Sequence, residues 1–165
     1  MHLFARVALA AAVLTVPCQA AVEYQKYGSA AGWDIFVNPQ MGPGCFIARQ
    51  NPDGATQVQM GIDATAAPRG YLALYSTKPR KVTQGEKISV VFDVDGDKYT
   101  GEAKGQETQG YDGAFVPFNN LDFIYDLAKK KTLTITATGR DPIVVKLAGT
   151  DDAFKALREC QGTQK

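Results

Sequence analysis

Three aspartates alternate with other residues in the run Asp93-Val94-Asp95-Gly96-Asp97. Alternating carboxylates resemble the first positions of a calcium-binding loop, so Asp93, Asp95 and Asp97 are candidate metal ligands. An EF-hand loop needs glycine at its sixth position and glutamate at its twelfth, whereas here glycine is fourth and Lys104 is twelfth. The run also joins two strand-like segments, and Asp-Gly at such a junction is typical of a hairpin turn. We favour the turn, keep calcium as the alternative, and predict no resident cofactor.

Histidine-based catalysis has no candidate residue in the part of the chain that we expect to persist. The only histidine is His2, which lies in an N-terminal segment predicted to be removed. The rest of the chain therefore lacks the imidazole of Ser-His-Asp, Cys-His and most zinc sites. Carboxylates, Lys, Tyr, Ser and Thr remain, so a hydrolase that uses only carboxylates is an alternative. Our leading prediction is that the protein is not an enzyme.

Cys45 and Cys160 are the only cysteines after position 20. An even pair of cysteines in an exported chain indicates a disulfide, and neither residue has the Cys-x-x-Cys spacing of a redox pair. The loop between them covers most of the chain, for which the chain-entropy model gives about 4–5 kcal/mol of stabilisation. We predict a structural bridge between Cys45 and Cys160.

A basic turn, residues 78–81, carries Lys78, Arg80 and Lys81 around a proline. Such a cluster is able to receive a phosphate, an acidic glycan or an anionic partner. On a chain with balanced charge it is also explained as a solvated turn. The three cations are therefore candidate binding residues.

Two aromatic residues are further candidates for binding. Tyr111 lies in a polar, glycine-containing segment, and aromatic residues on such loops are common in recognition surfaces. The alternative is a tyrosine folded back onto the sheet. Trp33, the sole tryptophan, is expected to pack in the core, but a partly exposed Trp33 would be a carbohydrate-stacking residue.

Residues 1–20 have the features of a secretory signal peptide. Arg6 gives a basic start, an apolar run follows over residues 7–16, and Cys18 and Ala20 are the small residues of a cleavage site. The run is shorter than the ~20 residues that a membrane-spanning helix needs. The alternative is a lipoprotein in which Cys18 becomes the modified first residue, although Pro17 fits that site poorly. We predict a periplasmic or secreted mature protein of residues 21–165.

The predicted mature chain has no net charge. The sequence has 18 Lys and Arg and 17 Asp and Glu, and Arg6 is the only charged residue before position 21, so 17 of each sign remain. A neutral chain has no general field that recruits nucleic acid or an anionic membrane. No later apolar run is long enough to span a bilayer. The length fits a single domain, with its oligomeric state left open.

The elements that position these residues are expected to be short strands joined by turns. Apolar and polar residues alternate, as at Val58, Met60 and Ile62, and Gly- or Pro-containing turns separate the runs. The predicted strands span residues 33–37, 45–49, 58–62, 71–75, 87–94, 98–103, 115–118, 132–137 and 143–147. Residues 105–113 are predicted as a loop, and 115–118 as an edge strand because Pro117 cannot donate to a ladder.

Two helices complete the expected fold. Asn120 is a suitable N-cap for the first, and Gly149 to Asp152 for a closing helix that carries Cys160. We predict a mainly β protein, a β-sandwich or flattened barrel of about eight strands with two short helices, the last at the C-terminus.

A resemblance to a known family rests on several of these segments: Gly32-Trp33-Asp34, the Gly44-Cys45 strand, the Asp95-Gly96 hairpin, and 147–150 leading into Ala156-Leu157-x-x-Cys160. Across most of residues 30–161 the chain resembles small exported proteobacterial proteins similar to the invasion-associated locus B family. The resemblance implies a periplasmic or secreted β-sandwich. That family has no agreed enzymatic activity, so no catalytic or binding residue is carried over.

The leading hypothesis is an exported, non-catalytic binding or structural module of the bacterial envelope. Its partner would be a protein or another envelope macromolecule. The first alternative is a glycan-binding domain that uses Trp33 or Tyr111, with calcium at the three aspartates. The second alternative is the carboxylate-only hydrolase.

Overall fold

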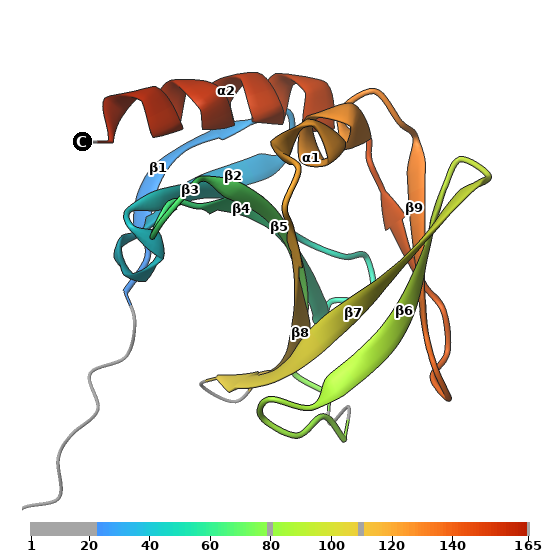
Figure 1. The fold of residues 1–165 in the computed structure, drawn as a ribbon. Helices are drawn as coiled ribbons and strands as arrows, with labels where there is room; N and C mark the ends of the chain where they lie inside the picture. The colour runs from blue at the N-terminus through green and yellow to red at the C-terminus, as the bar shows by residue number, and fades with distance from the viewer. Residues whose placement is uncertain (1–22, 79–80, 109–110, 165) are drawn as a thin grey trace, which may run out of the picture.

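Residues 23–78, 81–108 and 111–164 are described by the computed structural model, and they form one antiparallel sheet and two α-helices (Figure 1). The strands are β1 (Gln25–Ala30), β2 (Trp33–Asn38), β3 (Gly44–Gln50), β4 (Thr56–Asp63), β5 (Arg69–Ser76), β6 (Lys87–Val94), β7 (Asp97–Thr108), β8 (Tyr111–Phe118), β9 (Thr132–Ala137) and β10 (Ile143–Lys146). A 3-10 turn, η1 (Pro39–Met41), follows β2, and the helices are α1 (Leu121–Leu127) and α2 (Thr150–Thr163). The predicted signal peptide, with Cys18, lies outside the described residues.

The sheet has the strand order β1-β2-β3-β4-β5-β8-β7-β6-β9-β10, and its two outer strands are not paired with each other. Strand β5 pairs with β8 and β6 with β9, so these two pairs join segments that are distant in the chain. Figure 1 shows the strands curling around a central region, with α2 lying across β1, β2 and β3. The predicted mainly β class with two helices, the last at the C-terminus, is confirmed. The sheet is unclosed and has ten strands where about eight were expected.

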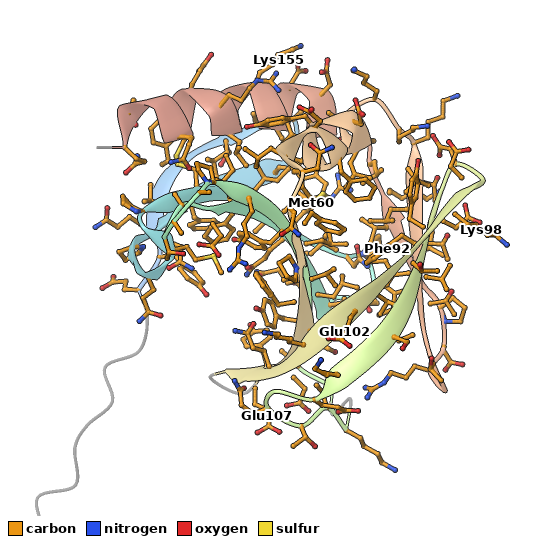
Figure 2. The ribbon with its side chains drawn as sticks, viewed as in Figure 1. Met60, Phe92, Lys98, Glu102, Glu107 and Lys155 are labelled. Atoms are coloured by element: carbon orange, nitrogen blue, oxygen red, sulfur yellow. A yellow bond between two sulfur atoms is a disulfide. The ribbon has the colours of Figure 1, made fainter. Side chains whose placement is uncertain are left out.

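One face of the sheet carries the main core. Residues two apart along a strand share a face, and the core side of β2 and β4 is formed by Trp33, Ile35, Val37, Val58, Met60 and Ile62. Helix α2 adds Phe154 and Leu157, which are fully buried. Figure 2 shows Met60 and Phe92 inside the curl, whereas Lys98, Glu107 and Lys155 lie at its periphery. The sequence alternation therefore identifies the buried face correctly.

A smaller apolar cluster lies on the opposite face of the sheet. Its buried members are Phe46, Ala48, Tyr71 and Ala73, and Phe36 and Phe115 pack against them. Phe36 stacks on Phe46 at a ring-centroid distance of 5.3 Å, and Tyr71 meets Phe115 at 5.2 Å. The strands between β2 and β8 are thus buried on both faces, which stabilises the centre of the sheet.

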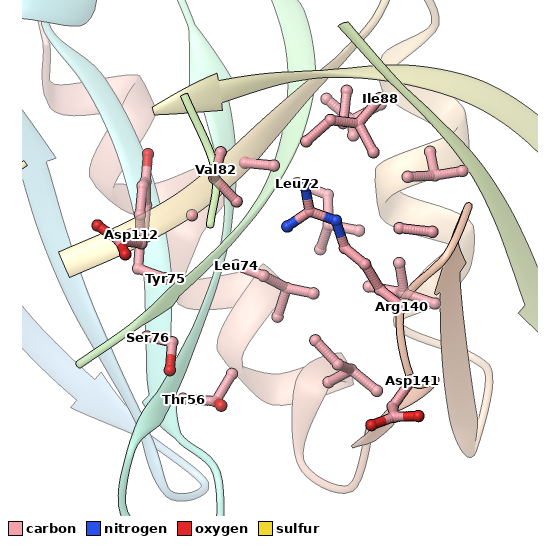
Figure 3. A pocket seen from close by; sticks show the side chains of 18 of the residues that line it. Thr56, Leu72, Leu74, Tyr75, Ser76, Val82, Ile88, Asp112, Arg140 and Asp141 are labelled. Atoms are coloured by element: carbon pink, nitrogen blue, oxygen red, sulfur yellow. The ribbon is translucent and has the colours of Figure 1, made fainter. Parts of the chain in front are cut away.

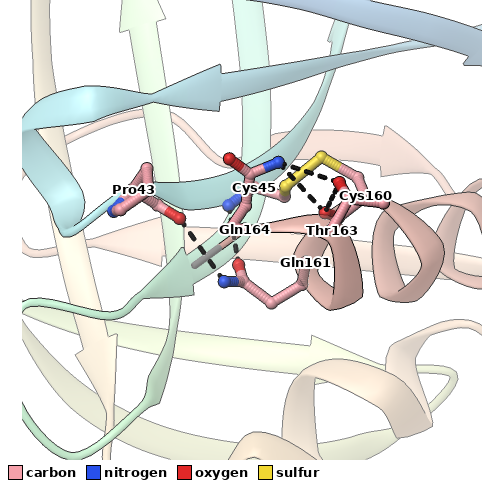
Figure 4. The surroundings of a disulfide bond; sticks show 6 residues. All are labelled: Pro43, Cys45, Cys160, Gln161, Thr163 and Gln164. Atoms are coloured by element: carbon pink, nitrogen blue, oxygen red, sulfur yellow. Dashed lines mark hydrogen bonds between the residues drawn. A yellow bond between two sulfur atoms is a disulfide. The ribbon is translucent and has the colours of Figure 1, made fainter.

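The predicted disulfide joins α2 to β3. Cys45 and Cys160 are bonded, with 6.2 Å between their Cα atoms, and both are fully buried. Beside the bond, the backbone N–H of Cys45 donates to Oε1 of Gln161 at 2.8 Å, and Gln161 Nε2 donates to the carbonyl of Pro43 at 3.4 Å (Figure 4). The helix is therefore fixed to the strand covalently and through its own side chain. No helix among the described residues is long and apolar enough to cross a membrane.

The Asp95-Gly96 hairpin is confirmed. Both residues have positive φ, 52° and 100°, as a tight turn between β6 and β7 requires. Asn120 is also confirmed as an N-cap, because its side chain accepts the N–H of Asp122 at 2.9 Å. Helix α1 ends at Leu127, so Lys129 to Lys131 follow it.

Three local predictions were wrong. Strand β1 was missed because its residues are mostly exposed and show no apolar alternation. The loop predicted over residues 105–113 is largely strand, since β7 continues to Thr108 and β8 begins at Tyr111. A Cβ at Gly105 would lie 2.2 Å from the carbonyl oxygen of Thr83, so this glycine permits close packing and does not mark a turn. The prediction of an edge strand at residues 115–118 was also wrong, because β8 lies between β5 and β7. Its pairing with β7 ends at Phe115, so Pro117 has a partner only on β5.

Candidate functional site

The curled sheet holds an apolar cavity of about 90 Å³. Strands β5, β6, β8 and β9 supply most of its lining, which includes Leu72, Leu74, Val82 and Ile88 (Figure 3). A water molecule needs about 10–15 Å³ of such space. The cavity therefore has room for about six to nine non-hydrogen atoms of the size of a water molecule.

Small side chains on the inner face leave this space open. Three cross-strand pairs join a large residue to an alanine that lines the cavity: Leu74 with Ala114, Ile88 with Ala103, and Val90 with Ala137. Alanine has no atoms beyond Cβ, so it leaves unfilled the volume that a larger side chain would occupy. The hollow is thus a property of how these strands pair.

Polar and charged side chains border the apolar lining. They are Thr56, Tyr75, Ser76, Asp112, Arg140 and Asp141. Figure 3 shows the guanidinium of Arg140 among the apolar side chains near the centre of the view, and the carboxylates of Asp112 and Asp141 closer to its edges. The cavity therefore combines an apolar lining with three hydroxyls, two carboxylates and one guanidinium.

Arg140 is positioned by the turn after β9. Its backbone N–H donates to the carbonyl of Ala137 at 3.1 Å, and its Nη2 donates to Oε1 of Glu86 at 3.5 Å and to the carbonyl of Lys81 at 3.4 Å. The Arg140 side chain is 28% exposed. Partial removal from water strengthens its electrostatic interactions relative to those of a free surface charge.

Two residues of the basic turn are next to residues that line the cavity. The backbone N–H of Lys78 donates to Oγ of Ser76, which lines the cavity, at 3.1 Å. Lys81 accepts from Arg140 and directly precedes the lining residue Val82. Both lysines are exposed, and Arg80 lies outside the described residues. Main-chain groups of Lys78 and Lys81 thus contact Ser76 and Arg140 respectively, and a binding role for the two lysine side chains stays a prediction.

Tyr75 adds a neutral hydroxyl at the border of the cavity. The hydroxyl donates to Oε1 of Gln106 on β7. Burial raises the pKa of Tyr75 well above its usual value, and the nearby Tyr24 raises it further. Tyr75 is therefore a hydrogen-bonding group at neutral pH and not a base.

Trp33 is a core residue and not an exposed stacking surface. Its ring is fully buried, and its Nε1 donates to the carbonyl of Ala148 at 3.2 Å. The Arg49 guanidinium lies 4.1 Å from the ring centroid and donates to the same carbonyl at 2.9 Å. The idea that Trp33 stacks on a sugar needs a partly exposed ring, and the burial of Trp33 contradicts it.

Tyr111 is exposed at the first position of β8, opposite Thr108. This position is near the end of the β7–β8 hairpin, where an aromatic side chain is accessible to a partner. A binding role for Tyr111 stays a prediction.

The three aspartates of the β6–β7 hairpin are engaged in separate local contacts. Asp93 Oδ1 accepts the N–H of Gly96 at 2.8 Å, and the Asp95 carboxylate accepts the N–H groups of Lys131 and Thr132, both at 2.9 Å. Asp97 Oδ2 lies 3.2 Å from Lys130 Nζ. Within the ranges that the structure covers, no group of three or more Asp, Glu, Cys or His side chains is arranged to hold a metal. Calcium binding here stays a prediction, and this geometry favours the turn.

Sequence reasoning missed Arg140 and the cavity itself. The segment before Asp141-Pro142 gives a turn signal, but nothing local shows that the Arg140 side chain contacts Lys81 and Glu86 or lines a cavity. The alanines that create the space also give no signal, since their role depends on which strands become neighbours. The strands that line the cavity were predicted at residues 71–75, 87–94, 115–118 and 132–137, but not which of them become neighbours.

Comparison with known proteins supports the fold. No protein-family model matches the chain, and no curated protein matches it in sequence. Among solved structures, the fold is similar to the crystal structure of invasion associated protein B from Bartonella henselae, with a TM-score of 0.57 and 20% identity. The match covers 81% of this chain and 96% of that one. The resemblance to the invasion-associated locus B proteins is therefore confirmed as a likeness of fold.

Proposed function

We propose that the mature chain is an exported, non-catalytic binding module of the bacterial envelope, with the cavity of the curled sheet as its ligand site. The observation that carries this proposal is the apolar cavity with a few polar groups at its border, held by paired strands. Concave apolar sites with few, well-placed polar groups are typical of small-molecule binding. The ligand would be a small molecule, or a small apolar group of an envelope macromolecule.

The available side-chain chemistry supports binding over catalysis. Cys45 and Cys160 are joined and offer no thiolate, and the described part of the chain contains no histidine. The cavity is bordered by carboxylates, hydroxyls and one guanidinium, around a lining that is mostly apolar. Export is supported by the signal-like residues 1–20 and by the disulfide, which persists in oxidising compartments.

Thermal unfolding of residues 21–165 with increasing n-hexanol tests the proposal. Hexanol is neutral and matches the size of the cavity, so its binding reports on the apolar interior alone. Because a ligand that binds only the folded state stabilises it, the melting temperature should rise with hexanol concentration. Above the dissociation constant, the rise should follow the logarithm of the free hexanol concentration.

Ala103→Leu is the matching cavity-filling variant. Ala103 is buried and lines the cavity, so a leucine there should occupy the ligand's space and abolish the hexanol effect. Val91→Leu adds bulk to an exposed position on the other face of β6 and should keep the effect. A melting temperature that is insensitive to hexanol in the wild type would count against the proposal, as would an equal response of all three proteins.

A further inference from the structure

We infer that the ligand of the cavity is a short neutral molecule with a hydrogen-bond acceptor, such as a carbonyl oxygen, and that the hydroxyl of Ser76 donates to it. This inference rests on the proposed function, because it names the ligand class of the same site. It is carried by a buried hydroxyl at the cavity whose proton has no acceptor among the residues that the structure describes.

Ser76 is the last residue of β5, and its side chain lies on the cavity face of that strand. Residues two apart along a strand share a face, and Leu72, Leu74 and Ser76 all line the cavity (Figure 3). Ser76 is only 3% exposed. Because a buried polar group with an unmet hydrogen bond costs free energy, a ligand that accepts from Ser76 would be stabilised there.

The three hydroxyls at the border of the cavity differ in where their protons go. The hydroxyls of Tyr75 and Thr56 both donate to side-chain oxygens of the protein. The Ser76 oxygen accepts the backbone N–H of Lys78 at 3.1 Å, and within the described part of the chain its own proton is donated to no other group. Ser76 therefore has a donor to offer a ligand.

The bond from Lys78 strengthens this donor. Hydrogen bonds that follow one another in a chain polarise each other, and they are stronger in the low dielectric of a protein interior than in water. A hydroxyl that accepts an N–H is thus a better donor than an isolated hydroxyl. An uncharged acceptor such as a ketone oxygen is therefore a suitable partner for Ser76.

Charges of both signs border the cavity, which favours a neutral ligand. Asp112 and Asp141 carry carboxylates and Arg140 carries a guanidinium, so a ligand charge of either sign would lie near a group of its own sign. An ion also loses more solvation than a neutral polar group when it enters an apolar space. The lining therefore favours an uncharged chain with one acceptor.

The volume of the cavity selects the probes. Room for about six to nine non-hydrogen atoms accommodates 2-pentanone, which has a carbonyl group, and 2-methyl-1-pentene, in which a CH2 group replaces the carbonyl oxygen. The two molecules have the same number of non-hydrogen atoms and nearly the same shape. Their comparison therefore isolates the contribution of the acceptor.

Infrared spectra of carbonyl-labelled 2-pentanone, with residues 21–165 in excess, test the inference directly. A hydrogen bond to the oxygen weakens the C=O bond, so the stretch of the bound ketone should lie at a lower frequency than in hexane. Ser76→Ala should return it to the hexane value. Ser89→Ala is the matched control and should keep the wild-type frequency, because Ser89 is an exposed serine on β6 that does not line this cavity.

NMR titrations of the same proteins measure the energetic counterpart. Ser76→Ala should weaken the binding of 2-pentanone about fivefold, the factor that corresponds to the ~1 kcal/mol of one net hydrogen bond. It should leave the binding of 2-methyl-1-pentene unchanged, and Ser89→Ala should change neither. If Ser76→Ala does not fold, Ser76→Cys keeps a weaker donor and should give a smaller frequency shift and an intermediate affinity for the ketone.

The outcomes separate the inference from the proposed function. A bound-ketone frequency equal to that in hexane would overturn the inference and leave the cavity as an apolar site. A low frequency that persists in Ser76→Ala would also overturn it, because another donor, such as a buried water molecule, would then hold the carbonyl. Equal weakening of ketone and alkene binding in Ser76→Ala would do the same. Binding of neither molecule to the wild type would contradict the proposed function as well.

Discussion

At the scale of single residues, Asp53 shows how a carboxylate holds a turn. Its Oδ2 accepts the hydroxyl of Thr56 at 2.7 Å, and its Oδ1 accepts the N–H groups of Thr56 and Ala55 at 2.8 and 3.0 Å. These bonds favour the ionised form, the Thr56 hydroxyl most of all, and they lower the pKa of Asp53 from 3.8 to about 2. The turn between β3 and β4 is therefore stabilised by an ionised side chain.

This arrangement predicts a specific dependence of stability on pH. Because the pKa of Asp53 is lower in the folded state, its contribution is complete above the unfolded value of 3.8 and is lost as the pH falls towards about 2. An NMR titration of the Asp53 carboxyl should give a midpoint of about 2. The free energy of unfolding of Asp53→Asn should fall less steeply than that of the wild type between these pH values. A midpoint near 3.8 would contradict the described turn.

Residue roles were predictable where the interacting partner is close in the chain. Asn120 caps a helix that begins at the next residue, and Asp95-Gly96 forms a turn from its own backbone preferences. Cys45 and Cys160 are far apart in the chain, but their pairing was predictable because they are the only cysteines after the predicted signal peptide. Arg140 contacts groups more than fifty positions away, so no local pattern indicates its place at the cavity.

At the scale of elements, Gly61 shows why β4 can pack closely against β3. The residue pairs with Phe46 on β3 and Tyr71 on β5. A Cβ at Gly61 would lie 2.4 Å from the Cβ of Phe46 and 2.8 Å from the carbonyl oxygen of Cys45. The glycine therefore leaves the space that the aromatic side chains on this face of the sheet occupy.

Gly61→Ala should lower the free energy of unfolding by about 1–3 kcal/mol, because the added methyl group overpacks the face. Gly28→Ala on β1 is the matched control, since a Cβ at Gly28 meets nothing within 4 Å. The control should change stability by no more than about 0.5 kcal/mol. Urea unfolding followed by the fluorescence of the buried Trp33 measures both variants. Equal losses in the two variants would show that close packing at Gly61 is not the cause.

The disulfide links two elements, and its loss should be visible in the same measurement. Cys45 and Cys160 are 115 positions apart, so breaking the bond should cost about 4–5 kcal/mol in the chain-entropy model. Reduced wild type and Cys45→Ala/Cys160→Ala should both unfold at lower urea concentrations than the oxidised protein. Unchanged midpoints would mean that contacts of α2 such as those of Gln161 hold the helix without the bond.

Most strands were predictable as elements, and the exceptions have a common cause. Strands such as β4 and β6 carry the apolar alternation that one buried face imposes. Strand β1 and the ends of β7 and β8 lack it, because main-chain pairing with a neighbouring strand holds them in place. Sequence shows which side chains are buried, but it does not show which backbone groups find a partner.

At the scale of the whole molecule, the order of the strands creates the candidate site. Pairing of β5 with β8 and of β6 with β9 brings Leu74 to Ala114 and Val90 to Ala137. These contacts join segments that the sequence separates by forty positions or more. The sequence could therefore indicate a mainly β chain, but not the position of its cavity.

Methyl NMR of residues 21–165 during a hexanol titration tests whether this cavity is the ligand site. If it is, saturable shifts should be largest for methyl groups of the cavity lining, including Leu74, Val82, Ile88 and Val116. Val144, an exposed residue on β10 that does not line the cavity, should not respond. Saturable shifts that centre on methyl groups away from the lining, or no saturable shifts at all, would contradict the claim.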